Sequence, residues 1–206
     1  MKLIRRILLI SLGFTISGLG TAIMYNAGIG STPNATFADG LHSILHISYG
    51  MGNALMNLLV FIPVLVWGRK LIGLGTWLCM LTMGLYINFW KAVLPPVSEA
   101  SLMARILIAC IGNVIFAAGL SFYINLKEGQ GPLDAMTELI HRKLKCSYGL
   151  AKCVCDGIFL VTGILLGGVA GIATVISVLC TGYLMQCFFL FYDKKIHNRR
   201  RVETKK

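Results

Sequence analysis

Two pairs of polar residues, each pair four residues apart, lie inside apolar segments of the chain. Lys152 and Asp156 form one pair, and Asn53 and Asn57 form the other. Residues four apart share a helix face, so the first pair can form an ion pair. Charged groups inside a bilayer are costly and tend to face a partner or a water-filled cavity. The pattern indicates a polar site in a membrane protein. Two alternatives stay open: Lys152 extends to the membrane edge, and the asparagines bond only to neighbouring helices.

Three further polar candidates lie in stretches that interrupt the apolar segments with glycine and proline. Asn34 follows Pro33, while Gln130 and Asp134 flank Pro132. Proline suits the first turn of a helix, so each stretch predicts a glycine-rich turn and then a short amphipathic helix. Such a helix either lies flat at the membrane surface or re-enters the protein, where its N-terminus suits an anionic ligand. The predicted substrate-binding residues are Asn34, Asn53, Asn57, Gln130, Asp134, Lys152 and Asp156.

The composition is that of a membrane protein. Of the 206 residues, 56% are hydrophobic and only 13% are charged. Apolar runs of about 18 or more residues predict membrane helices. The predicted spans run over about residues 7–25, 51–67, 74–90, 102–124, 150–166 and 172–192.

The chain contains an internal repeat. Residues 26–50 align without a gap on residues 125–149, so that Asn26 meets Asn125 and His42 meets His141. The repeat divides the chain into 1–100, 101–192 and a basic tail, 193–206. Each half has three spans, and an odd number of crossings makes the second half enter the bilayer upside down. The predicted fold is an all-α polytopic membrane protein, with six transmembrane helices as two inverted three-helix repeats.

The basic residues predict the orientation. If both termini are cytoplasmic, sixteen of the 19 Lys and Arg residues lie on the cytoplasmic side. This is the positive-inside bias of a multi-pass protein of the inner (plasma) membrane. A five-span alternative would place the basic tail outside. Basic clusters between apolar spans favour a topology signal over nucleic-acid binding, so the bilayer is a predicted partner and nucleic acid is not.

The sequence lacks the short motifs of several enzyme classes. It has no Gly-x-Ser-x-Gly, no His-Glu-x-x-His and no phosphate loop, so no catalytic residue is assigned and the protein is not predicted to be an enzyme. The seven cysteines form no Cys-x-x-Cys pair. His42 and His46 are four apart, but only Asp39 accompanies them. We therefore predict no metal site and no cofactor.

Paired glycine motifs carry a family resemblance. Gly-x-x-Pro turns end at Pro33 and Pro132, and glycine-rich segments open at Gly73 and Gly171. In this respect the chain resembles the YczE/YitT-like family of bacterial integral membrane proteins. That family has Pro-x-Asp in both halves, whereas here only the second half has it, ending at Asp134. The resemblance implies a membrane fold and one acidic position instead of two equivalent ones.

Two functional hypotheses remain. The first is a secondary transporter or permease for a small solute, with its site between the halves and with Asp156 carrying a coupling proton. The second is a membrane accessory or scaffold protein that docks a cytoplasmic partner through Arg142, Lys143, Lys145 and the basic tail. A cavity that reaches Asp156 would favour transport, and a closed bundle would favour docking. The pattern Gly163-x-x-x-Gly167-x-x-x-Gly171 suits either packing within the fold or a homodimer.

Overall fold

The computed structural model describes residues 2–47, 49–97 and 99–203, and the regular structure of these residues is helical, without strands. The helices are α1 (Lys2–Asn26), α2 (Pro33–Leu45), α3 (Tyr49–Trp67), the short 3₁₀ helix η1 (Arg69–Leu71), α4 (Leu74–Val93), α5 (Leu102–Asn125), α6 (Pro132–Leu144), α7 (Tyr148–Leu165) and α8 (Ile172–Glu203). Helix α8 continues past the predicted end of the last span at residue 192. The end of the predicted basic tail, residues 204–206, lies outside the described residues.

Four of the described helices, α1, α5, α7 and α8, are long and apolar enough to cross a membrane. Helix α3 carries a shorter apolar stretch, Met51–Trp67, which contains Pro63. Large apolar side chains are exposed on these helices and on α4, where Leu81 is 72% exposed. Exposed apolar surface of this extent suits contact with lipid. The all-helical prediction is confirmed, and the six-span inverted arrangement stays a prediction.

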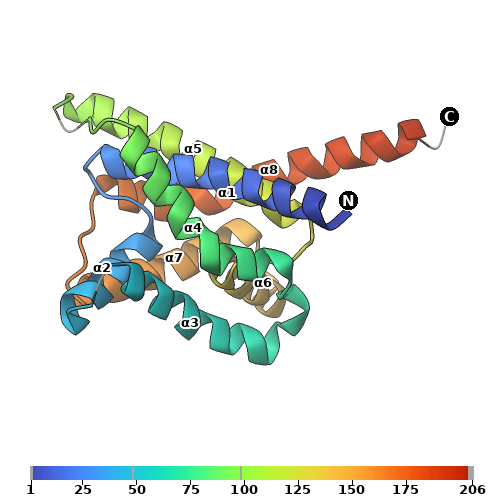
Figure 1. Ribbon diagram of the computed structural model, residues 1–206, viewed down its shortest axis with the longest axis horizontal. Coiled ribbons are helices and arrows are strands. Elements are labelled where there is room, and N and C mark those ends of the chain that lie inside the picture. The colour runs from blue at the N-terminus through green and yellow to red at the C-terminus, as the bar shows by residue number, and fades with distance from the viewer. Residues whose placement is uncertain (1, 48, 98, 204–206) are drawn as a thin grey trace.

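The helices form two layers. In one layer α1 packs against α4 and α5, and α5 packs against α8. In the other layer the short helices α2 and α6 each pack against both α3 and α7, and contacts between α7 and α8 join the layers. Figure 1 shows α2 and α6 in different parts of the second layer, and it shows the start of α1 and the end of α8 on one side of the molecule.

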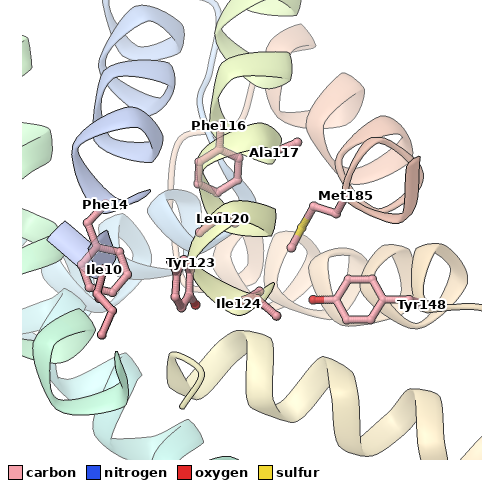
Figure 2. Packing of buried hydrophobic residues seen from close by; sticks show 9 residues of the cluster. All are labelled: Ile10, Phe14, Phe116, Ala117, Leu120, Tyr123, Ile124, Tyr148 and Met185. Carbon is pink, nitrogen blue, oxygen red and sulfur yellow. The ribbon is translucent and has the colours of Figure 1, made fainter. Parts of the chain in front are cut away.

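Close helix contact holds the first layer together. A Cβ atom on Gly20 of α1 would lie 2.3 Å from the backbone nitrogen of Phe116 in α5, and one on Gly119 would lie 2.5 Å from that of Ser17. Only glycine allows the two backbones to approach so closely. Beside this crossing, buried side chains of α1, α5, α7 and α8 form the main apolar cluster, which includes Phe14 and Met185 (Figure 2).

The local structure around the two short helices recurs with a spacing of 99 residues. Both helices have 13 residues and begin with proline. Their C-caps, His46 and Lys145, both have a φ of 51°. In each copy a histidine ring nitrogen contacts a backbone carbonyl five residues later, with His42 at Ile47 in the first and its counterpart in the second. These histidines hold the helix ends, which gives them a structural role.

Each half of the chain holds the glycine-rich turn of the other half. The Gly75 N–H donates to the Glu128 carbonyl over 2.8 Å, and the Ala173 N–H donates to the Ile29 carbonyl over 2.9 Å. The Thr76 hydroxyl also donates to the Gln130 carbonyl over 2.7 Å. These bonds fix the starts of α4 and α8 against the turns that precede α6 and α2, so the halves position one another's short helices.

Arg105 on α5 binds the backbone just after the end of α1. Its Nε and Nη2 atoms donate to the carbonyls of Ala27 and Gly28, each over 2.6 Å. Hydrogen bonds from a charged donor contribute about 1.5–3 kcal/mol, and a cation is also favourable at a helix C-terminus. Arg105→Ala should lower the free energy of unfolding by about this amount, as measured by thermal unfolding in detergent. Arg142→Ala, which removes an exposed ion pair with Glu138, is the control and should cost under about 1 kcal/mol. Equal losses in the two variants would contradict the role of Arg105.

Candidate functional site

A cavity of about 460 Å³ lies between the two layers and is lined by residues of the seven α-helices α1 to α7 or of their N-terminal caps. Part of its wall is apolar, with Met56, Met83 and Phe116 among the lining residues. The rest is polar and includes asparagine amides, an aspartate and a lysine. A concave site with an apolar wall and a few convergent polar groups is the usual form of a small-molecule site.

The short helices begin at this cavity. At the start of α2, Thr32, Asn34 and Ala35 contribute to the lining, and at the start of α6 all residues from Gly131 to Asp134 do. Pro33 and Pro132 are buried, whereas Leu45 and Leu144 at the far ends are exposed. The burial favours helices that enter the protein with their N-termini inside over helices that lie flat on its surface. Free N–H groups and the positive ends of two helix dipoles therefore face the cavity.

The predicted Lys152–Asp156 pair forms within α7. The Lys152 Nζ lies 2.9 Å from Asp156 Oδ1, and each side chain is 3% exposed. Lys152 lines the cavity and Asp156 does not. Lys152 therefore does not extend to the surface; its ammonium is buried between its partner and the cavity. Asp156 serves as the fixed counter-charge of that ammonium.

The predicted asparagine pair lines the cavity from α3. The Asn57 Nδ2 donates to the Asn53 carbonyl over 2.9 Å and lies 3.5 Å from Asn53 Oδ1. Two amides and one ammonium, from helices α3 and α7, thus face the same space. Three of the four residues of the two predicted pairs therefore border one cavity, and Asp156 lies behind Lys152.

Asp134 is the second buried carboxylate of the site. It lies in the first turn of α6 and is 6% exposed. The hydroxyl of Tyr123, from the C-terminal part of α5, donates to its Oδ2, and the Gly131 N–H donates to that hydroxyl oxygen over 3.1 Å. Asp134 lines the cavity, so its charge is available to a bound ligand.

The remaining predicted residues, Asn34 and Gln130, differ in position. Asn34 lines the cavity, and its Oδ1 atom is buried without a hydrogen-bond partner. Gln130 lies outside the cavity lining. Its backbone N–H donates to the Leu71 carbonyl over 2.9 Å, so its backbone holds the turn, while its side-chain Oε1 is buried without a partner. The structure thus gathers Asn34, Asn53, Asn57, Asp134 and Lys152 around one space, with Asp156 behind them.

Sequence reasoning missed several lining or supporting residues. The repeat did not indicate Tyr123 as a site residue, because its counterpart in the other half is the apolar Met24. Asn88, which lines the cavity from α4, could have been found. A spacing of 98 residues pairs it with Gln186, whose Oε1 accepts from the Gly149 N–H over 3.3 Å. Two polar residues at matching places in apolar spans were a usable sign.

Metal binding has no support among the residues that the structure describes. They contain no group of three or more His, Cys, Asp or Glu side chains that could hold a metal ion. Instead, Asp134 and Lys152 line the cavity and Asp156 lies behind Lys152, so these three side chains form a buried ionisable cluster.

Known relatives resemble this chain over most of its length. An uncharacterised protein of Haemophilus influenzae is 27% identical over 176 residues, which cover 84% of this chain and 78% of the relative. The uncharacterised protein YyaS of Bacillus subtilis is 25% identical over 194 residues, covering 92% and 95%. The uncharacterised membrane protein YczE of the same organism is 22% identical over 175 residues, covering 84% and 80%. No solved structure matches the chain.

A family model gives the assignment. The family of unknown function DUF6198 matches residues 4–189, a range that contains every residue of the cavity. The similarity to YczE confirms the predicted resemblance, and the membrane description of YczE agrees with the four long apolar helices. The chain is therefore an integral membrane protein and belongs to the DUF6198 family.

Proposed function

We propose that the chain crosses the plasma membrane six times, as two inverted repeats with both termini in the cytoplasm. Helices α1, α3 and α4 would be the spans of one half, and α5, α7 and α8 those of the other. The matching short helices and the reciprocal bonds between the turns support two equivalent halves. The start of α1 and the end of α8 lie on one side of the molecule, which supports an even number of crossings (Figure 1). The excess of basic residues then sets the orientation.

The function that the geometry supports best is secondary transport of a small solute. One observation carries this proposal: a cavity lies between the halves and is lined by the starts of both short helices and by a buried lysine. Transporters with inverted repeats bind their substrates in such a place, and rocking of one half against the other exposes the site to each side in turn. No catalytic step is proposed.

Docking of a cytoplasmic partner is the weaker candidate. The exposed end of α6 does carry Arg142, Lys143 and Lys145, but Arg142 is paired with Glu138 over 2.6 Å. Lys143 lies 6.0 Å from the centre of the Trp67 ring. A scaffold also needs no cavity at its centre, so the cavity favours transport. The side chains of the basic tail lie outside those described, and they add nothing to this comparison.

Thiol labelling tests the transport proposal. In a variant without native cysteines, Asn53→Cys places one thiol in the cavity wall, and membrane-impermeant reagents are applied to vesicles from each side. We expect labelling, because a transport site must be open to water on at least one side, and a transported solute should slow the labelling. The control keeps only Cys155, which is buried and does not line the cavity. If the Asn53→Cys thiol stays as unreactive as Cys155 from both sides, the cavity is sealed and transport is excluded.

A further inference from the structure

The buried charges at the cavity do not balance. Lys152, Asp134 and Asp156 are each at most 6% exposed, so one ammonium accompanies two carboxylates. A buried charge without a counter-charge is strongly unfavourable in a protein interior, and more so inside a membrane. The start of α6 supplies only a partial positive charge, so part of one negative charge is left without a counter-charge among the described side chains.

The geometry identifies which carboxylate lacks a partner. Lys152 contacts Asp156 over 2.9 Å, and this is the ion pair of both residues. No ion pair of Asp134 with a described Lys, Arg or His side chain is present. The hydroxyl of Tyr123 is its direct partner. Lys152 acts on Asp134 only as a more distant charge.

The groups that face Asp134 come from every helix around it. Helix α4 contributes the neutral thiol Cys79, and α5 contributes Tyr123. Helix α7 contributes the neutral groups Tyr148 and Cys155 and the charged pair Lys152 and Asp156. The polar groups that α3 adds to the cavity are the uncharged amides of Asn53 and Asn57, and on α6 itself Glu138 is engaged by Arg142.

We propose that Asp134 binds and releases the coupling proton of transport, which makes this protein a proton-coupled carrier. The proposal rests on the transport function proposed above. A proton from cavity water bonds to a carboxylate oxygen of Asp134, and the neutral acid removes the unbalanced charge. When the cavity opens to the other side, the O–H bond breaks and the proton returns to water. The ion pair of Lys152 and Asp156 stays charged throughout.

Charge and position favour Asp134 over Asp156 as the proton carrier. Asp156 is stabilised in its charged form by the ammonium beside it, and it does not line the cavity. Asp134 lines the cavity, and its side-chain partner among the described residues is the Tyr123 hydroxyl. This reassigns the coupling role that the sequence suggested for Asp156.

The repeat also sets the number of protons. The counterparts of Asp134 and Tyr123 in the other half are Ala35 and Met24. Neither can titrate, although the start of α2 lines the same cavity. The inverted halves therefore form one carboxyl–hydroxyl pair instead of two, and one proton is expected for each transport cycle.

Infrared titration of the purified protein in lipid vesicles tests the assignment without a known solute. A protonated carboxylic acid has a carbonyl stretching band that disappears on ionisation, and the chain has only eight acidic residues. Exposed carboxyl groups are ionised above about pH 6, so above that pH we expect a band that titrates in the wild type and is absent in Asp134→Asn. Glu138→Gln, on the same helix, is the matched control and should keep the band. Above about pH 6, a band that persists in Asp134→Asn, or no titrating band in the wild type, would overturn the proposal.

A second variant keeps the test decisive if Asp134→Asn does not fold. Tyr123→Phe preserves the ring that packs 4.7 Å from Phe14, centre to centre, and removes only the hydroxyl. That hydroxyl donates to the charged carboxylate and favours it, so its loss should move the midpoint of the band to higher pH. An unchanged midpoint would contradict the assignment. Thiol labelling at position 53 without a titrating band would exclude the proton role and leave transport intact, whereas a sealed cavity would exclude transport itself.

Discussion

Replacing Lys152 with methionine is expected to lower the free energy of unfolding by about 3–5 kcal/mol. The substitution keeps most of the side-chain volume but leaves Asp156, 2% exposed, without the ammonium that lies 2.9 Å away. Lys152 is also a positive charge that acts on Asp134, and the substitution removes it. Asp134 and Asp156 would then be two buried carboxylates that repel each other, without the ammonium of Lys152.

A double variant tests the whole ion pair separately from the loss of a single charge. Lys152→Met together with Asp156→Leu removes both charges, and such replacements of a buried ion pair are often neutral or stabilising. The double variant should therefore recover most of the stability lost in Lys152→Met. Thermal unfolding in detergent, followed by the loss of the monodisperse peak in size-exclusion chromatography, measures both. Lys143→Met, at an exposed position on α6, is the control and should change stability by less than about 0.5 kcal/mol. A loss in Lys152→Met as small as that of the control would mean that the ammonium is solvated.

Local patterns were enough to predict several parts of this site. The four-residue spacing of Lys152 and Asp156 fixes their contact within one helix, whatever surrounds it. The starts of α2 and α6 followed from Pro33 and Pro132, since proline at the first helical position needs no tertiary contact. The repeat then transferred each feature of one half to the other. The structure therefore has helices at the places that the sequence predicted.

The parts that could not be predicted depend on how helices rotate and cross. Spacing places Lys152 and Asp156 on one face, but it does not say which of them borders the cavity. Tyr123 meets Asp134 only because the chain reverses between α5 and α6 and brings the end of one helix over the start of the other. The sequence indicated Gln130 as a substrate-binding residue, yet its backbone N–H donates to the carbonyl of Leu71. None of these contacts has a local signature.

The contact between the two halves depends on glycines that no other residue can replace. Gly129 has a φ of +101°, a backbone conformation that residues other than glycine rarely adopt. A Cβ atom there would lie 2.5 Å from the Gly73 backbone nitrogen and 2.6 Å from its Cα. The crossing is held closed by the hydrogen bond from the Gly75 N–H to the Glu128 carbonyl, so the clash cannot be relieved without moving α4 away from the turn before α6.

Gly129→Ala is therefore expected to lower the free energy of unfolding by about 2–6 kcal/mol, from backbone strain and from the overpacked crossing. Gly30→Ala, its counterpart with a φ of +105° and a Cβ position 2.5 Å from Thr174 Oγ1, should lose a similar amount if the halves are equivalent. Gly157→Ala is the matched control on α7, since nothing lies within 4 Å of its Cβ position. It should be neutral or stabilising by up to about 1 kcal/mol, because alanine favours a helix over glycine. Thermal unfolding of the three variants measures the differences. If Gly129→Ala unfolds at the temperature of Gly157→Ala, the turn does not lie against α4, and the reciprocal bonds cannot hold the two short helices at the cavity.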